Sequence, residues 1–202
     1  MALPDFAVVD VETSGLNVRR HRVLQLAVIT VDAEGNLVDE WDTFVKLRWP
    51  LSRVGPTHVH GITRPMLRGA PKLDAVLGEF AERVGDSLFV AHNAQFDGEF
   101  LLRAARRSGR PESELASLER RLCTLRMSRR LDPDRVESHR LGDLCDRYGV
   151  PLLNPHEAKA DARATAAVLP HLLRAHGITD EAELEPFLDG PRLPASDRSG
   201  QS

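Results

Sequence analysis

Two carboxylates interrupt an apolar run near the start of the chain, and this run constrains the fold most. The segment Phe6-Ala7-Val8-Val9-Asp10-Val11-Glu12 is typical of a central strand covered on both faces. Side chains alternate along a strand, so Asp10 and Glu12 point to the same face, roughly 7 Å apart. Two like charges beside a core lose hydration and repel each other. A divalent cation would offset both costs, whereas two ordinary acids at the solvent end of the strand are the alternative.

The composition is that of one soluble domain. The chain has 202 residues, of which 42% are hydrophobic and 28% charged, and this suits a single globular core. No apolar run approaches the roughly 20 residues of a membrane span, and the N-terminus lacks the basic and apolar regions of a signal peptide. We therefore expect a cytoplasmic protein without membrane contact. Cys123 and Cys145 have no metal-like spacing and suit a reducing compartment.

Charge is unevenly distributed along the chain. The net charge of −3 argues against a generally basic surface for nucleic acid. Arginines are nevertheless crowded between residues 103 and 140. A phosphate-contacting surface and a solvated helix face are equally good interpretations of this segment.

The first half of the chain predicts a meander of strands followed by a strand-to-helix unit. We expect strands at 6–12, 23–31 and 37–45, with the third antiparallel to the second across the turn at 32–36. A helix at 72–84, a short buried strand at 88–91 and a helix at 94–108 should follow. Asp97 then lies in the first helical turn, near the carboxyl end of the strand, where functional groups gather in such units.

Two histidines lie in the irregular segment between the third strand and the first long helix. His58 and His60 precede Gly61 and could form a short helical turn that ends at this glycine. No third ligand is close in the sequence, so we expect a structural or substrate-lining loop rather than a metal site.

The second half predicts mainly helices. A short strand at 121–124 leads into a helix ending near 131, and a further helix is expected around 141–148. A long alanine-rich helix should cover 158–176, with Pro170 interrupting or kinking it. The pattern weakens after Gly177. We therefore expect a domain at 1–176 and a largely disordered extension at 177–202, with a helical turn or two within 181–188.

Acids and one histidine occur at the ends of elements that can meet in space. Two divalent ions roughly 3.5–4 Å apart can clamp both oxygens of a phosphodiester displacement, held by three or four carboxylates. Hard oxygen ligands select Mg²⁺ or Mn²⁺, and a neutral histidine can accept the proton of the attacking water. His156 fits the loop before the long helix, with Asp161 in its first turn. The set is Asp10, Glu12, Asp97, His156 and Asp161.

Three motifs in order resemble those of the DEDDh exonucleases, such as the proofreading epsilon subunit of bacterial DNA polymerase III. The first is Val9-Asp10-Val11-Glu12-Thr13-Ser14-Gly15-Leu16, the second His92-Asn93-Ala94-Gln95-Phe96-Asp97, and the third His156-Glu157-Ala158-Lys159-Ala160-Asp161-Ala162. The segment from Thr57 to Thr63 also resembles a loop of epsilon-like domains. The likeness covers residues 5 to 175.

The resemblance implies an α/β, RNase H-like fold: a mixed five-stranded sheet with an antiparallel second strand, flanked by helices. It implies a 3′→5′ exonuclease that uses two Mg²⁺ or Mn²⁺ ions and releases nucleoside 5′-monophosphates. Asp10, Glu12 and Asp161 would hold the ion that activates water. Asp10, with Asp97 directly or through water, would hold the second ion, and His156 would be the general base.

The resemblance also assigns substrate contacts. The backbone of Thr13 would meet the terminal 3′-OH, and Leu16 would wedge against the terminal base. Packing of Leu16 under the turn is an equal alternative. His92 and Asn93 are expected to be structural residues near the site, and Phe96 and Phe100 to belong to the core.

Several functional alternatives stay open. Single-stranded DNA is the expected substrate, but a 3′-trimming exoribonuclease of the RNase T or oligoribonuclease type would share the five site residues. A catalytically silent binding module of a DNA polymerase assembly is disfavoured, because a retired site should lose at least one ligand. Residues 177 to 202 contain no convincing clamp-binding motif. We therefore expect a stand-alone epsilon-like enzyme rather than a dedicated replicase subunit, with a DNA polymerase as a candidate partner.

Overall fold

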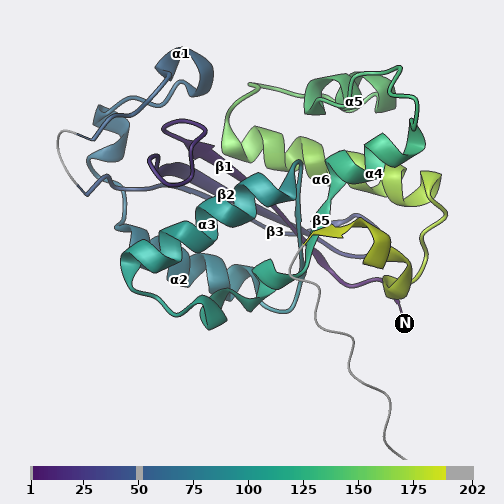
Figure 1. The fold of residues 1–202 in the computed structure, drawn as a ribbon, viewed down its shortest axis with the longest axis horizontal. Helices are drawn as coiled ribbons and strands as arrows, with labels where there is room; N and C mark the ends of the chain where they lie inside the picture. Colours follow the sequence, from purple (N-terminus) through teal and green to yellow (C-terminus); the bar gives the residue numbers. More distant parts are fainter. Residues whose placement is uncertain (1, 49–51, 190–202) are drawn as a thin grey trace, which may run out of the picture.

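A six-stranded mixed sheet forms the centre of the molecule (Figure 1). The computed structural model describes residues 2–48 and 52–189, without the side chain of Glu112. The strand order is β3-β2-β1-β4-β5-β6. β1 (Phe6–Thr13) is central and pairs antiparallel with β2 (Val23–Val31), which pairs antiparallel with β3 (Leu37–Phe44). The predicted meander is therefore confirmed.

The other side of β1 carries the parallel part of the sheet. β4 (Leu88–Ala91) runs parallel to β1, and β5 (Arg121–Cys123) runs parallel to β4. The expected RNase H-like α/β class, with its antiparallel second strand, is confirmed. The sheet has six strands rather than the five expected, because a short strand near the C-terminus pairs with β5.

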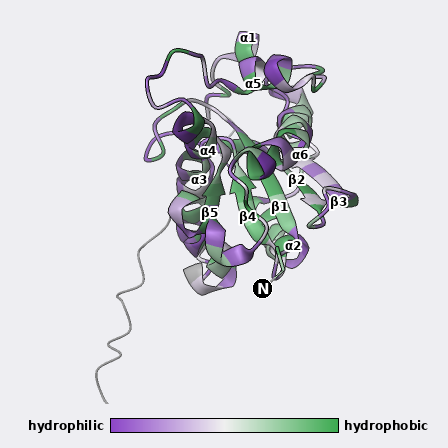
Figure 2. Cartoon of the chain, turned by 90° about the vertical axis from the view of Figure 1, so that its right-hand side faces the viewer, coloured by the Kyte–Doolittle hydropathy of each residue, from purple (hydrophilic) through white to green (hydrophobic). Residues whose placement is uncertain are grey.

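Helices cover both faces of the sheet (Figure 2). α2 (Leu73–Val84) and α3 (Ala94–Ser108) pack on one face through residues such as Val76 and Phe80. α5 (Leu141–Tyr148) and α6 (Ala158–Ala175) pack on the other face. The remaining helical segments are α1 (Thr57–His60), η1 (Pro65–Leu67), η2 (Glu112–Glu119) and α4 (Thr124–Leu131).

The alternation of β1 decides where its carboxylates point. Phe6 and Val8 belong to the core cluster on the α6 side, whereas Ala7, Val9 and Val11 belong to the cluster beneath α2 and α3. Even-numbered residues of β1 therefore face α6. Asp10 and Glu12 continue this series beyond the apolar part of the strand, so they share one face, as the sequence predicted.

The edge strand β3 is strongly charged. It carries Asp39, Glu40 and Asp42, and these acids form ion pairs with lysine and arginine side chains of the helices on both faces of the sheet. Glu40 pairs with Lys159 at 2.9 Å and with Arg163 of α6. Asp39 pairs with Arg83 of α2 at 2.7 Å.

Pro170 does not interrupt α6, so this expectation is wrong, whereas a kink at Pro170, the alternative expectation, stays a prediction. The helix runs continuously over Ala158–Ala175 with Pro170 inside it. A proline in a helix removes one backbone hydrogen bond. Buried contacts before and after Pro170, from Val168, Leu169 and Leu172, hold the helix on the sheet and offset this loss.

The domain continues beyond residue 176, where the sequence placed its boundary. The 3₁₀ segment η3 (Glu181–Phe187) and the strand β6 (Leu188–Asp189) follow, and Leu184 and Phe187 lie in the core cluster under α6. The helical turn expected within 181–188 is confirmed as η3, and Ile178, Leu184 and Phe187 dock this part of the extension on the core, so it is not disordered. The expectation for residues 190–202 lies outside the described residues.

No helix in the described part of the chain is long and apolar enough to cross a membrane.

Docking of the C-terminal segment should contribute to stability. Leu184 is fully buried, so we expect Leu184→Ala to lower the free energy of unfolding by about 2–5 kcal/mol. Leu37→Ala is the matched control, because Leu37 is 61% exposed. Urea denaturation of the whole chain measures both. Equal stability of Leu184→Ala and wild type would contradict the described packing.

Candidate active site

Asp10 and Glu12 lie near the C-terminal end of β1, and their half-buried side chains are on the face of the sheet that packs against α6. Burial raises the pKa of Asp10 well above its ordinary value, and the charges of Asp97, Asp161 and Glu12 add to this effect. Burial raises the pKa of Glu12 to about 8, with further contributions from Asp161 and Asp97. The four acids proposed from the sequence are therefore close enough to repel one another.

Asp97 reaches this place from the opposite helical layer. It lies in the first turn of α3 and is 3% exposed. Its Oδ1 accepts a hydrogen bond from the backbone N–H of Val11 at 3.1 Å. Burial raises the pKa of Asp97 to about 7, although the N–H groups of Val11 and of Asp97 itself oppose the shift. The Asp97 side chain is thus fixed to the backbone of β1 at Val11, the residue between Asp10 and Glu12.

Asp161 and His156 come from the start of α6. The backbone N–H of His156 donates to Asp161 Oδ2 at 3.2 Å, whereas Asp161 Oδ1 is buried without a hydrogen-bond partner. Burial raises the pKa of Asp161, opposed by the hydrogen bond and charge of His156. His156 is exposed and has a φ of 68°, in the left-handed region.

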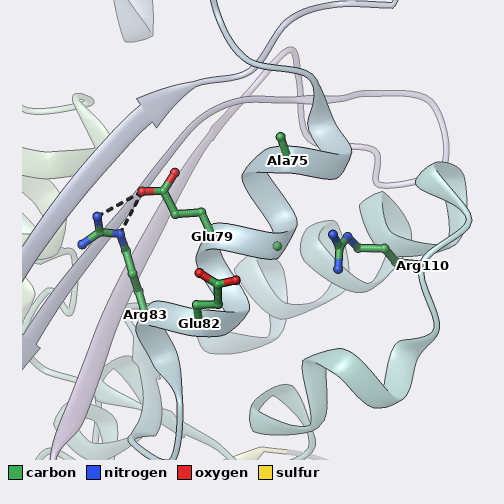
Figure 3. A pocket seen from close by; sticks show the side chains of 6 residues that line it. Ala75, Glu79, Glu82, Arg83 and Arg110 are labelled. Carbon is green, nitrogen blue, oxygen red and sulfur yellow. Dashed lines mark hydrogen bonds and ion pairs between the residues drawn. The ribbon is translucent and has the colours of Figure 1, made fainter.

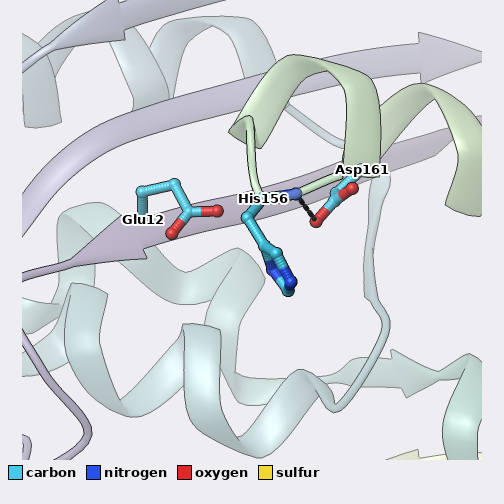
Figure 4. A group of neighbouring side chains, drawn as sticks. All are labelled: Glu12, His156 and Asp161. Carbon is cyan, nitrogen blue, oxygen red and sulfur yellow. Dashed lines mark hydrogen bonds between the residues drawn. The ribbon is translucent and has the colours of Figure 1, made fainter. Parts of the chain in front are cut away.

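Glu12, His156 and Asp161 point into one space (Figure 4). Each offers one ligand atom, and these atoms lie within 4.8 Å of one another. The structure thus brings together all five residues that the motifs selected, from β1, α3 and the start of α6.

Gln25 is a residue of the site region that the motifs missed. It lies opposite Glu12 on β2 and is 3% exposed. Its Oε1 accepts from the backbone N–H of Ala158 at 3.4 Å, and its Nε2 donates to Asp42 at 3.4 Å. Gln25 therefore ties the first turn of α6 to the sheet beside Glu12. A polar residue inside an otherwise apolar strand was the available signal.

His92 is a structural residue, as expected. Its ring nitrogens contact Thr124 Oγ1 at 3.0 Å and the carbonyl of His139 at 3.1 Å. Burial lowers the pKa of His92 to about 4, so the ring is neutral and joins three segments behind the site. The next residue, Asn93, has a φ of 77° and starts α3.

Thr13 and Leu16, in the segment after Glu12, differ in exposure: the first is buried and the second exposed. Thr13 is buried, and its hydroxyl donates to the carbonyl of Gly15 at 3.0 Å. Leu16 is 84% exposed. Packing of Leu16 under the turn, one of the two sequence interpretations, is therefore wrong.

His60 and three arginines of the arginine-rich segment also have structural explanations. His60 is buried, and its Nδ1 accepts from the backbone N–H of Ile62 at 3.0 Å, which closes α1. Within the arginine-rich segment, Arg110 pairs with Asp74, Arg120 with Glu181 and Glu185, and Arg126 with Asp189. These ion pairs explain the three arginines as structural residues.

A surface hollow of about 620 Å³ beside α2 is lined by none of the five proposed site residues (Figure 3). It is lined by side chains of α2 and by Arg110. Arg83 bonds to Glu79 there at 3.0 Å, and Arg110 pairs with Asp74 at 2.9 Å. The guanidinium groups of Arg83 and Arg110 are thus neutralised by neighbouring acids, so we assign this hollow no function.

The site fits divalent cations. Four carboxylates with raised pKa values converge there, and one buried oxygen of Asp161 lacks a donor. Such a group is stabilised by added positive charge. Oxygen donors are the ligands of hard ions such as Mg²⁺ and Mn²⁺. Fold and site together define a nuclease.

Comparison with known proteins identifies the family. The profile of the exonuclease family matches residues 7–169, and the chain belongs to this family. The predicted DnaQ-like exonuclease membership is confirmed. The chain is 34% identical over 170 residues to a DNA polymerase III PolC-type of Halalkalibacterium halodurans, covering 84% of this chain and 11% of that protein. It is 36% identical over 183 residues to the PolC-type polymerase of Streptococcus suis, covering 89% and 12%. The chain thus spans about a ninth of these relatives.

Solved structures share the fold. Escherichia coli exonuclease I in complex with a dT13 oligonucleotide superimposes with a TM-score of 0.71 and 22% identity, covering 86% of this chain and 42% of that one. A 3′-exonuclease that recognises a histone mRNA stem-loop gives a TM-score of 0.73 at 12% identity, covering 86% and 83%.

The pKa of Glu12 predicts a pH dependence of the metal-free protein. The folded value of about 8 exceeds the ordinary 4.5, so the folded state binds this proton more tightly than the unfolded state. The resulting stabilisation is complete below pH 4.5 and is lost as the pH rises through 8. In chelator, wild type should therefore lose more unfolding free energy between about pH 6 and 8.5 than Glu12→Gln.

Urea denaturation at both pH values measures this difference. Glu34→Gln, in an exposed turn, is the control and should keep the wild-type slope. Parallel pH profiles for wild type and Glu12→Gln would contradict the electrostatic account of the site.

Proposed function

We propose that this domain is a metal-dependent 3′→5′ exonuclease that hydrolyses phosphodiester bonds of single-stranded DNA and releases nucleoside 5′-monophosphates, in proofreading or repair. One observation carries the proposal: Asp10, Glu12, Asp97 and Asp161 converge at the end of β1, with an exposed histidine beside them. This convergence of negative charge costs stability unless cations offset it. The family membership supports the same activity.

The carboxylates would hold two divalent ions, Mg²⁺ or Mn²⁺. Asp10, Glu12 and Asp161 would bind one ion, and Asp10 with Asp97 the other. When bound, such ions lower the pKa of the attacking water and neutralise the charge that develops on the phosphate. The apolar part of β1 and the Val11 hydrogen bond to Asp97 hold the ligands in place beforehand, so little reorganisation is needed.

His156 would accept the proton of the attacking water. The residue is exposed, on the loop before α6, and one ring nitrogen lies within 4.8 Å of a carboxylate oxygen of Glu12 and of Asp161. The backbone hydrogen bond to Asp161 fixes the loop without using the imidazole. Among the described residues no hydrogen bond engages the imidazole, so the unprotonated nitrogen of the neutral ring is available to accept a proton.

The turn after β1 would bind the 3′ terminus. Thr13 follows Glu12 at the end of β1, and its backbone would meet the terminal 3′-OH. Leu16 exposes 84% of its surface, and an apolar side chain of this kind can stack on the terminal base. Covering it with a base would remove apolar area from water.

RNA is the second candidate substrate. One structural neighbour with a TM-score of 0.73 is a 3′-exonuclease that recognises histone mRNA, whereas another is exonuclease I bound to a DNA oligonucleotide. Equal cleavage of matched DNA and RNA oligonucleotides, or preference for RNA, would replace the DNA assignment.

We further propose that the domain acts in the cytoplasm and works with a DNA polymerase. The support is the name of its relatives, DNA polymerase III PolC-type. Co-purification from native extract with a polymerase catalytic subunit tests this association. A catalytically silent module is disfavoured, because all five site residues are retained and brought together.

The activity should depend on metal and on Asp10. With Mg²⁺, a 5′-labelled single-stranded DNA should shorten from its 3′ end, and chelator should stop the reaction. Asp10→Ala should abolish shortening, because it removes the ligand shared by both ions. Asp134→Ala, at an exposed position, is the control with wild-type activity. Full activity of Asp10→Ala would overturn the assignment.

His156→Ala should separate catalysis from binding. Loss of a general base lowers turnover by about 10²–10⁴-fold, while Mn²⁺ binding measured by calorimetry and oligonucleotide binding should stay near wild type. His171→Ala is the control, because His171 lies about 20 Å along α6 from the start of the helix. Loss of metal binding in His156→Ala would make His156 a ligand instead.

A further inference from the structure

A group of arginines surrounds the turn that follows the site. Arg19, Arg20 and Arg22 lie in the β1–β2 connection, and Arg103 and Arg107 lie on the second half of α3. These five residues form the basic cluster. In Figure 1 the connection lies over α3, and Arg107 donates to the carbonyls of Val18 at 3.1 Å and His21 at 2.7 Å.

Only part of this cluster has a structural explanation. Arg107 fastens the connection to α3, and Arg22 donates to the carbonyls of Arg20 and His21 at 2.8 and 2.9 Å. Arg19 and Arg20 are exposed, and their backbone N–H groups, not their guanidinium groups, bond to Asn17 Oδ1. The Nε of Arg103 is buried without a hydrogen-bond partner.

The cluster is not neutralised by the protein. Within residues 2–48 and 52–189, no acid forms an ion pair with a member of the basic cluster. Glu99 lies one turn before Arg103 but accepts instead from Gln95 at 3.0 Å. Burial lowers the pKa of Arg107, and the charges of Arg22 and Arg103 lower it further.

The cluster is adjacent to the carboxylates. Arg22 and Ser14 are joined by two hydrogen bonds, from Ser14 N to the Arg22 carbonyl at 2.9 Å and from Arg22 N to Ser14 Oγ at 3.0 Å. Ser14 follows Glu12 by two residues, roughly 7 Å along an extended chain. Positive charge thus begins directly beyond the turn that carries Leu16, while the site itself is negative.

We propose that the basic cluster binds the phosphate backbone of the nucleic-acid strand upstream of its 3′ end. This inference rests on the proposed function for the position of the 3′ terminus. A polyanion supplies the negative charge that the protein does not supply to Arg19, Arg20 and Arg103. Phosphate contacts of this kind hold a strand without reading its sequence. The cluster would therefore increase affinity for long strands and contribute little to short ones.

The test is the double variant Arg19→Gln/Arg20→Gln, because neither side chain has a contact that holds the fold. Fluorescence anisotropy of a labelled 12-nucleotide DNA, in chelator and over a salt series, measures binding without turnover. Loss of two phosphate contacts should weaken binding about tenfold near 0.1 M salt and reduce the salt slope by about 1.4. A trinucleotide, which is too short to reach the basic cluster, should bind the double variant with the same affinity as wild type.

The matched control is Arg129→Gln/Arg174→Gln, which removes the same charge from exposed positions on α4 and α6. It should keep the wild-type salt slope. An unchanged slope in Arg19→Gln/Arg20→Gln, or equal losses in both double variants, would overturn the inference. Failure of the proposed function is distinguishable, because wild type would then bind the 12-nucleotide DNA yet leave it unshortened with Mg²⁺.

Discussion

The hydrogen bond from the backbone of Val11 to Asp97 links the two halves of the active site. Asp10 and Glu12 face α6, whereas Asp97 belongs to α3 on the opposite face of the sheet. A side chain of α3 can reach the face of the sheet covered by α6 only beyond the continuously buried apolar part of β1, which ends at Val9. The bond is made at that point, between Asp10 and Glu12. The crowding of carboxylates depends on this bond, because without it Asp97 could turn toward solvent and relieve the repulsion.

The stability of the rest of the fold is what makes such crowding tolerable. β2 is buried along its whole length, and β1 is buried up to Val9, so the strand cannot shift to separate its charges. Gln25 and His92 connect the neighbouring elements behind the site. The domain therefore holds its ligands in an arrangement that is unfavourable for the empty protein and favourable for the charged complex.

The sequence predicted most elements and the five proposed site residues, because local periodicity and motif spacing report on local structure. The shared face of Asp10 and Glu12 followed from strand geometry alone. Features that depend on long-range docking were not predictable. Leu184 and Phe187 join the core from a weakly patterned segment, and Pro170 is tolerated because its helix is packed on both sides of it. Exposure of Leu16 was equally undetermined, since the sequence does not show what covers a turn.

The acids of β3 have a consequence beyond their ion pairs. An edge strand presents free backbone groups that can recruit a strand from another protein. Asp39, Glu40 and Asp42 place negative charge along that edge, and lysine and arginine side chains from α2 and α6 fold over it. At the opposite edge, β6 is two residues long. An exonuclease domain built in this way can be placed beside other folded units without offering its β3 edge for intermolecular β-pairing.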